Sequence, residues 1–215
     1  MHIADGVITD PAVLAGTWIL GGGGILVASR AFARDQGEER AALVGVLGAF
    51  VFAAQMVNFP LLGLPVSTHL VGTGLITCLL GPAAAIVVIA AVLLVQALLL
   101  QDGGVIAYGA NALNLAVAGA LAAAIVIRAV PARIRGHGAV GAAAAVAAVF
   151  ASTAACSLEL ILGADLDPRL VIAGLGTSQA LSAVWEGAIT VLSLAAIRAI
   201  LGRGTPVWPS AGSPA

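Results

Sequence analysis

The chain has 215 residues, a mean hydropathy of +1.12 and 61% hydrophobic residues, with only 9% charged ones. A soluble domain carries about 25% charged residues, so these values exclude a disordered chain, a nucleic-acid binder and an ordinary water-soluble enzyme. The net charge is −1, so the overall charge of the chain does not by itself imply an electrostatic partner. All nine basic residues are arginines, and because a P-loop requires a lysine, we expect this chain to bind no nucleotide.

Apolar runs long enough to cross a bilayer fill most of the chain. They predict an all-α, multi-pass membrane protein built as one bundle of seven transmembrane helices. We expect a single domain over residues 1–201, followed by a flexible, Gly/Pro/Ser-rich tail over 202–215. The expected helices cover residues 12–29, 41–57, 67–80, 83–100, 105–128, 138–162 and 171–199.

The arginines predict the orientation of this bundle in the cell membrane. Basic residues favour cytoplasmic loops, and with the N-terminus outside eight arginines fall on the cytoplasmic side and only Arg169 on the outer side. We therefore expect the N-terminus outside and the C-terminus in the cytoplasm. The first residues include Asp5 and Asp10 but no basic region. A cleaved secretory signal is not expected, so the mature chain is predicted to begin at Met1.

The third expected helix is interrupted at its start. Pro60 and Pro65 leave about 14 residues of regular helix after Ser67, or about 21 Å, against a hydrocarbon core of about 30 Å. The stretch 58–66 is therefore predicted to enter the bundle from the outer side as non-helical chain, and such broken spans point to transporter substrate sites. Ser67 or Thr68 is expected to cap the helix, with His69 in its first turn.

Two of the three histidines fall on the predicted outer side. His2 follows Met1 directly, and a large second residue protects Met1 from removal, so its α-amine is expected to stay free. That amine, the backbone nitrogen of His2 and its imidazole form a compact chelate, and His69 would add a fourth nitrogen. Four nitrogens in a plane suit Ni(II) or Cu(II), and Co(II) is also compatible.

Other roles stay open for these residues at this point. A His at position 2 is usually a solvated terminus, and a His within a span often hydrogen-bonds to a neighbouring helix. Ionisable residues inside spans are nevertheless functional candidates. Asn58, beside the interrupted segment, is a candidate to orient a ligand. His137, in a predicted cytoplasmic loop, is interpreted as a solvated residue.

Small residues recur every four positions along the second expected helix, where they would let another helix approach closely. The four are Ala41, Gly45, Ala49 and Ala53.

Several segments resemble the CbiM/NikM family, the substrate-binding (S) components of cobalt and nickel transporters of the energy-coupling-factor type. The resemblance runs from residue 1 to about residue 200. It is carried by MHIADG (1–6), NFP (58–60), STHLVG (67–72), QALLLQDGGVIAYGAN (96–111) and EG (186–187).

The resemblance implies a seven-helix bundle into which the N-terminal segment folds from outside. It also implies that Met1, His2 and His69 hold Ni²⁺ or Co²⁺ as transported substrate, with Asn58 nearby as support. The family usually has Gly where this chain has Thr68. The chain would not itself be an enzyme, because its partners in the bilayer would be a transmembrane T component (CbiQ/NikQ-like), separate ATPase subunits (CbiO/NikO-like) and a small accessory subunit (CbiN/NikN-like).

We expect the small-residue face of the second helix to contact the T component. Two alternatives differ in class. A stand-alone metal permease driven by an ion gradient would use Glu159 and Glu186 to relay charge. An intramembrane enzyme would use His69 as base and Ser67 as nucleophile, although two positions apart on a helix they would point to different faces.

Overall fold

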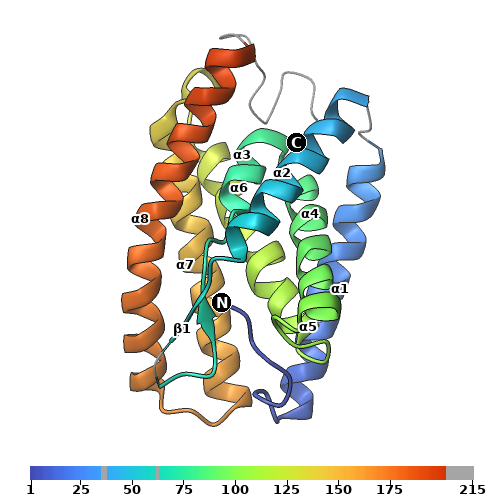
Figure 1. The fold of residues 1–215 in the computed structure, drawn as a ribbon, viewed down its shortest axis with the longest axis vertical. Coiled ribbons are helices and arrows are strands. Elements are labelled where there is room, and N and C mark those ends of the chain that lie inside the picture. The colour runs from blue at the N-terminus through green and yellow to red at the C-terminus, as the bar shows by residue number, and fades with distance from the viewer. Residues whose placement is uncertain (35–37, 62, 202–215) are drawn as a thin grey trace.

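The computed structural model describes residues 1–34, 38–61 and 63–201 (Figure 1). Most of these residues are helical, and the two strands are only two residues long. The strands are β1 (Phe59–Pro60) and β2 (Ser67–Thr68). The helical elements are α1 (Pro11–Ala33), α2 (Glu38–Gln55), α3 (Thr73–Leu80), α4 (Pro82–Val95) with its π-helical end η1 (Gln96–Leu100), α5 (Tyr108–Asn111), the π-helix η2 (Ala112–Ala118), α6 (Gly119–Ala129), the 3₁₀ turn η3 (Ala132–Ile134), α7 (Gly138–Gly163) and α8 (Pro168–Leu201).

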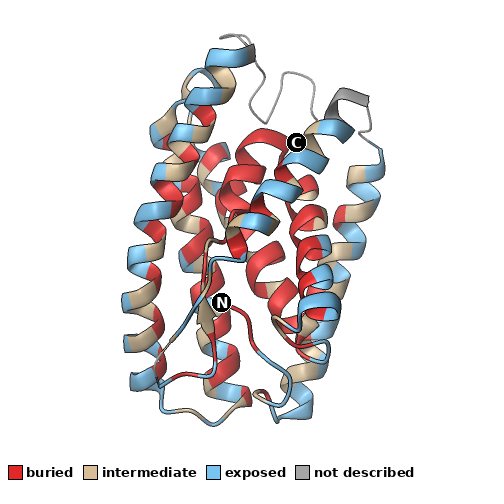
Figure 2. Ribbon diagram, in the orientation of Figure 1, coloured by how far each residue is buried: buried red, intermediate tan, exposed pale blue. Residues whose placement is uncertain are grey.

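The long helices form one bundle whose centre is filled by α3, α4 and α6 (Figures 1 and 2). α7 packs along α8 and α6, and α1 packs along α4. Every residue of α3 is buried, whereas α1 and α8 bury one side and expose the other. The most buried helices are therefore the short central ones.

The outer surface of the bundle is apolar, and its exposed side chains include Ile19, Leu99 and Ile125. An apolar surface of this extent is stable in contact with lipid but not with water. Within the described residues, five helical segments are long and apolar enough to cross a membrane, and they begin at Pro11, Pro82, Tyr108, Gly138 and Pro168. The chain is thus a membrane protein of helical fold.

The predicted count of seven full spans is not confirmed by the described residues. Five of the predicted spans agree with an observed long segment to within four residues at each end. The apolar part of α2 is limited to Ala41–Gln55, and α3 has only eight residues. The tail predicted to be flexible, residues 202–215, lies outside the described residues.

The interrupted segment before α3 is confirmed, but the prediction that its helix starts at Ser67 is wrong. No helix occurs in the described residues between Gln55 and Thr73, and Thr68 pairs with Phe59 in a short antiparallel ladder. The helix begins only after Gly72, whose φ of 76° suits glycine. Neither Ser67 nor Thr68 caps α3, and His69 precedes its first turn because this stretch is extended.

The close approach of α1 to α5 depends on glycine. A Cβ atom on Gly21 would overlap the backbone carbonyl oxygen of Gly109, whereas one on the neighbouring Gly22 would meet nothing within 4 Å. The contact cannot relax by turning a side chain, because the obstacle is backbone.

We therefore expect Gly21→Ala to destabilise the bundle by about 1–3 kcal/mol, the usual cost of overpacking. Gly22→Ala is the matched control, and its higher helix propensity should leave stability unchanged or raise it by up to about 1 kcal/mol. Thermal unfolding of the purified protein in detergent measures both. Equal unfolding temperatures for the two variants would contradict this packing.

Candidate metal-binding site

The first three residues run into the middle of the bundle (Figure 1), where Met1 and Ile3 are fully buried. The side chain of Asn111 binds both backbone polar groups of one residue in this N-terminal thread, Ile3. Its Oδ1 accepts from the backbone N–H of Ile3 at 2.8 Å, and its Nδ2 donates to the Ile3 carbonyl at 2.9 Å. Ile3 also pairs with Val66 of the interrupted segment. The N-terminal thread is thereby fixed between two parts of the chain far apart in sequence.

A second clamp lies two residues further along the thread. The carboxylate of Asp5 accepts from the backbone N–H of Val105 at 3.0 Å and of Ala107 at 2.9 Å. Gly104 donates its N–H to the Ile3 carbonyl at 2.9 Å, and any side chain at Gly104 would overlap Asp5. The turn between η1 and α5 is therefore bound tightly to the N-terminal thread.

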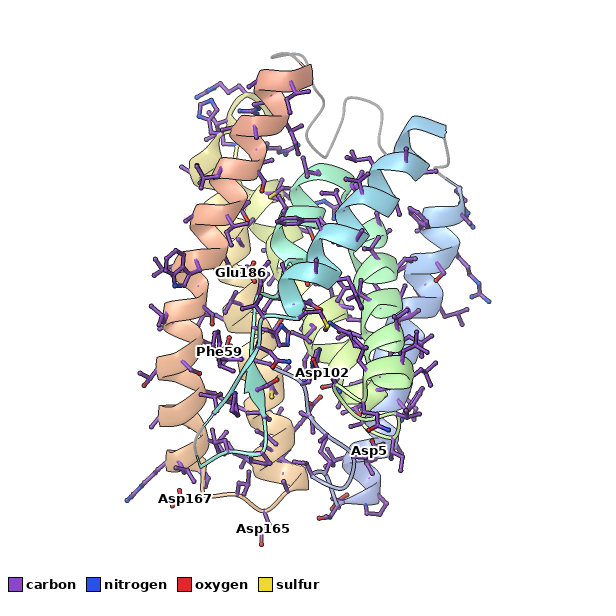
Figure 3. All side chains as sticks on the ribbon, in the orientation of Figure 1. Asp5, Phe59, Asp102, Asp165, Asp167 and Glu186 are labelled. Carbon is purple, nitrogen blue, oxygen red and sulfur yellow. The ribbon has the colours of Figure 1, made fainter. Side chains whose placement is uncertain are left out.

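The segment that carries His69 is fixed from α8. The buried carboxylate of Glu186 accepts from the backbone N–H groups of Val71 and Gly72, and Gln55 donates to the Val71 carbonyl at 2.9 Å. Glu186 thus binds the backbone N–H groups of the two residues just before α3, and neither Ser67 nor Thr68 is the N-cap of this helix. Figure 3 shows Glu186 projecting from α8 toward this segment.

These supports bring the α-amine of Met1 to 2.6 Å from Nε2 of His69. Nδ1 of His69 lies 2.6 Å from the carbonyl oxygen of Leu70. Because a carbonyl only accepts, Nδ1 carries the ring proton, and Nε2 keeps a free lone pair directed at the amine. His69 is 4% exposed and Met1 is 0% exposed, so this pair of nitrogens is shielded from water.

His2 completes the cluster. Its ring centroid lies 4.4 Å from that of His69, and its Nδ1 donates to Oδ1 of Asp102 at 3.0 Å. This hydrogen bond is the main reason that the pKa of Asp102 lies below its usual value. Burial lowers the pKa of His2, so its ring is neutral and Nε2 is a lone-pair donor. That Nε2 is buried and has no hydrogen-bond partner in the described part of the chain.

Burial also lowers the pKa of the Met1 amine from 8.0 to about 5. At neutral pH the amine is therefore uncharged and able to donate its lone pair. An uncharged amine and two neutral imidazoles close together form a donor set that suits late first-row transition ions. The sequence-predicted residues Met1, His2 and His69 are thus brought together by the fold.

The structure connects Asn58 to these nitrogens through Asp102. Its Nδ2 donates to Oδ2 of Asp102 at 2.9 Å, and Asp102 in turn bonds to His2. His137 is exposed at the start of α7, far along the chain from the cluster. Asn58 therefore contacts the cluster through Asp102, and His137 is a surface residue as expected.

The proposed nucleophile–base pair of an intramembrane enzyme is not formed. Both ring nitrogens of His69 are engaged, with Met1 and with Leu70. Ser67 Oγ has no hydrogen-bond partner within the described residues. The premise that the two residues lie on a helix is also wrong, since this stretch is extended.

Sequence reasoning did not predict that four further residues build the cluster, namely Asp5, Asp102, Asn111 and Glu186. Asp102 and Asp5 are isolated acids in apolar surroundings, and Asp102 precedes the pair Gly103–Gly104. That signal was present, because an acid beside two glycines in a membrane protein needs a partner. The partners of Asp5 are backbone groups about 100 residues away, and those of Asp102 are the side chains of His2 and Asn58, which no local pattern identifies.

The comparisons with known proteins agree on one class. The family profile of the cobalt uptake substrate-specific transmembrane region, CbiM, matches residues 2–202. The fused nickel transport protein NikMN of Rhodobacter capsulatus is 40% identical over 126 residues, which are 59% of this chain and 36% of that protein. The cobalt transport protein CbiM of Thermosediminibacter oceani is 48% identical over 81 residues, 38% of this chain and 33% of that protein.

A crystal structure of a transition metal transporter has the same fold, with a TM-score of 0.84 over 93% of both chains at 22% identity. The aligned segments of the relatives cover only about a third of their own length. The chain is therefore a membrane protein that shares its helical fold with that structure. The chain belongs to the CbiM family of cobalt uptake transmembrane proteins.

The lowered pKa of the Met1 amine predicts how nickel binding depends on pH. A metal competes with protons for this amine, which in a free peptide with the same first three residues titrates near its ordinary pKa of 8.0. Between about pH 8 and pH 6.5 the peptide should lose about tenfold more affinity per pH unit than the protein, because over this range only the peptide has an amine to deprotonate.

Competition titrations of both with a nickel indicator measure the two slopes. Equal slopes over this range would contradict a buried, uncharged amine.

Proposed function

We propose that this chain captures Ni²⁺ or Co²⁺ at the outer face of the cell membrane, as the substrate-specific S component of an energy-coupling-factor transporter. The observation that carries the proposal is the buried cluster of the Met1 amine, His2 and His69, with 2.6 Å between the amine and Nε2 of His69. Adjacent ligands of one ion lie about 3 Å apart, given metal–nitrogen bonds of about 2.0–2.1 Å. Both nitrogens are thus spaced as neighbouring ligands would be.

The chemistry of the cluster favours a late transition ion over Mg²⁺ or Ca²⁺. Those hard cations need several oxygen ligands, whereas the three proposed donors, Met1, His2 and His69, offer nitrogen. Deprotonation of the His2 backbone N–H on binding would add a fourth nitrogen in the same plane, which suits Ni(II). The relatives named above include both a nickel and a cobalt transport protein, and the donor set serves either ion.

The membrane topology follows from the arginine bias. With the N-terminus outside and the C-terminus in the cytoplasm, the N-terminal thread and the interrupted segment enter the bundle from the outer side. The seven helical segments then comprise five full spans plus the shorter α2 and α3. Because α2 and α3 are too short to fill the outer side of the bundle, the non-helical chain between them occupies that space and places His69 inside the bundle.

ATP hydrolysis is assigned to separate partner subunits, and this chain is not an enzyme. The face of small residues on α2 is proposed as the contact with the T component, since all four are exposed. Gly45 and Ala49 line an apolar groove of about 370 Å³ between α2 and α4. The name of the R. capsulatus relative joins an M and an N part in one chain, which supports association with a small accessory subunit. The four residues are Ala41, Gly45, Ala49 and Ala53.

The gradient-driven permease is the weaker alternative. It assigned charge relay to Glu159 and Glu186, yet both carboxylates take part in buried hydrogen bonds. Glu159 accepts from Asn114 at 2.6 Å and joins α7 to η2, while Glu186 holds the backbone ahead of α3. These contacts support a packing role for each carboxylate.

The proposal predicts about one nickel or cobalt ion per purified chain. His2→Ala, His69→Ala or one residue inserted before Met1 should each lower affinity by at least about a hundredfold, because each removes a ligand or shifts the amine. His137→Ala is the matched control and should bind as the wild type does. Metal content and competition titration measure the outcome.

Retention of the ion by all three variants would refute the site. Thermal unfolding without metal separates lost binding from lost folding, because a correctly folded variant should unfold within a few degrees of the wild type.

A further inference from the structure

Asp102 lies between the buried nitrogens and the surface of the protein. Its side chain is 21% exposed, while that of its partner His2 is 2% exposed. Among Met1, His2, His69 and Asp102, it is the only one that carries a negative charge and reaches the surface. Figure 3 shows Asp102 beside the N-terminal thread, at the turn that follows η1.

The turn that carries Asp102 is held rigidly. Gln101 and Gly103 on either side have φ values of 56° and 86°, and the backbone N–H of Asp102 donates to the Gln96 carbonyl at 3.2 Å. A Cβ on Gly103 would lie 3.5 Å from the His2 side chain, so this turn packs directly on His2. Asn58 fixes the second carboxylate oxygen at 2.9 Å. The carboxylate is therefore aimed at one place, the Nδ1 edge of His2.

Nδ1 is also the ring nitrogen that a chelate would need. Only Nδ1 closes a six-membered ring through the metal with the backbone nitrogen of its own residue, because Nε2 lies on the far side of the imidazole. In this structure Nδ1 donates to Asp102. Closing the chelate therefore requires His2 to exchange its hydrogen bond with Asp102 for a bond to the ion.

We propose that Asp102 is the receiving carboxylate of the transporter, which takes up the incoming divalent cation first and passes it to His2. This inference rests on the proposed function as a nickel or cobalt S component. The distance from Oδ1 to Nδ1 is 3.0 Å, which equals the spacing of about 3 Å between adjacent ligands of one ion. A cation can therefore touch both atoms during the transfer without either side chain moving away.

The exchange conserves protons and charge in a simple way. The cation binds the carboxylate and displaces the Nδ1–H donor; the Nδ1 proton passes to water and Nε2 takes one proton from water, so the imidazole stays neutral, and the later deprotonation of the His2 backbone N–H releases one proton to water. His2 then turns with the ion toward the Met1 amine and His69. Asp102 is left behind at the surface and does not hold the ion in its final position.

This order of events predicts a change in the rate of capture and not in the rate of release. A fixed carboxylate raises the local concentration of cations, and clefts of one charge raise association rates by about tenfold or more. Asp102→Asn keeps the size of the side chain but removes the charge, so we expect nickel association to slow by about tenfold while dissociation changes less than about twofold. The association rate of the wild type should also fall more steeply with ionic strength than that of the variant.

The control is Asp165→Asn, which removes an acid at the same end of the bundle. Asp165 is exposed and points away from the bundle (Figure 3), and its φ of 51° is one that asparagine adopts readily. Asp165→Asn should leave both rates unchanged. Asp102→Glu, which keeps the charge, should restore most of the association rate.

Stopped-flow mixing of the metal-free protein in detergent with NiCl₂, followed by a nickel-sensitive dye, measures association, and chelator chase measures dissociation. An unchanged or faster association in Asp102→Asn would overturn the proposal. So would faster release with unchanged association, because Asp102 would then stabilise the bound ion. A wild type that binds no nickel would instead refute the proposed function, and so the two failures are distinguishable.

Discussion

The double hydrogen bond between Asn111 and the backbone of Ile3 is the contact on which the candidate site depends. It fixes a chain terminus, which is normally the most mobile part of a protein, inside a bundle of helices. With Ile3 held at 2.8 Å and 2.9 Å by one side chain, the two residues before it have little freedom. The α-amine therefore reaches His69 at a set distance, and a group that is ordinarily solvated becomes a buried donor.

Many of the buried polar groups around the N-terminal thread have hydrogen-bond partners. Asp5 and Gly104 bind the thread to the turn before α5, and Glu186 satisfies the backbone ahead of α3. Nε2 of His2 is one of the buried side-chain atoms that have no hydrogen-bond partner within the described residues. Unsatisfied polar groups are costly inside a membrane. We therefore infer that the His2 imidazole can exchange its present hydrogen-bond partner for another one. A turn of His2 away from Asp102 is the smallest such change.

The helices could be predicted from sequence to within a few residues, since long apolar runs between Gly, Pro and charged breaks leave few choices; α8, for example, was expected at 171–199 and is observed at Pro168–Leu201. The three nitrogen ligands could also be proposed, because His2 and His69 are rare polar residues in this chain. The start of α3 could not, because the backbone just before it is held by Glu186, more than 100 residues away. Asp102 was missed for the same reason, as its role depends on the N-terminal thread that reaches it.

The central claim is that the chain terminus and two imidazoles share one cation. X-ray absorption at the nickel K-edge of the purified, nickel-loaded protein tests it most directly, because the spectrum reports the element, number and geometry of the ligands. The account predicts a planar shell of nitrogen donors with the outer-shell scattering of two imidazoles, reduced to one imidazole in His69→Ala if that variant keeps any ion. A six-coordinate shell dominated by oxygen, with no imidazole scattering, would contradict it.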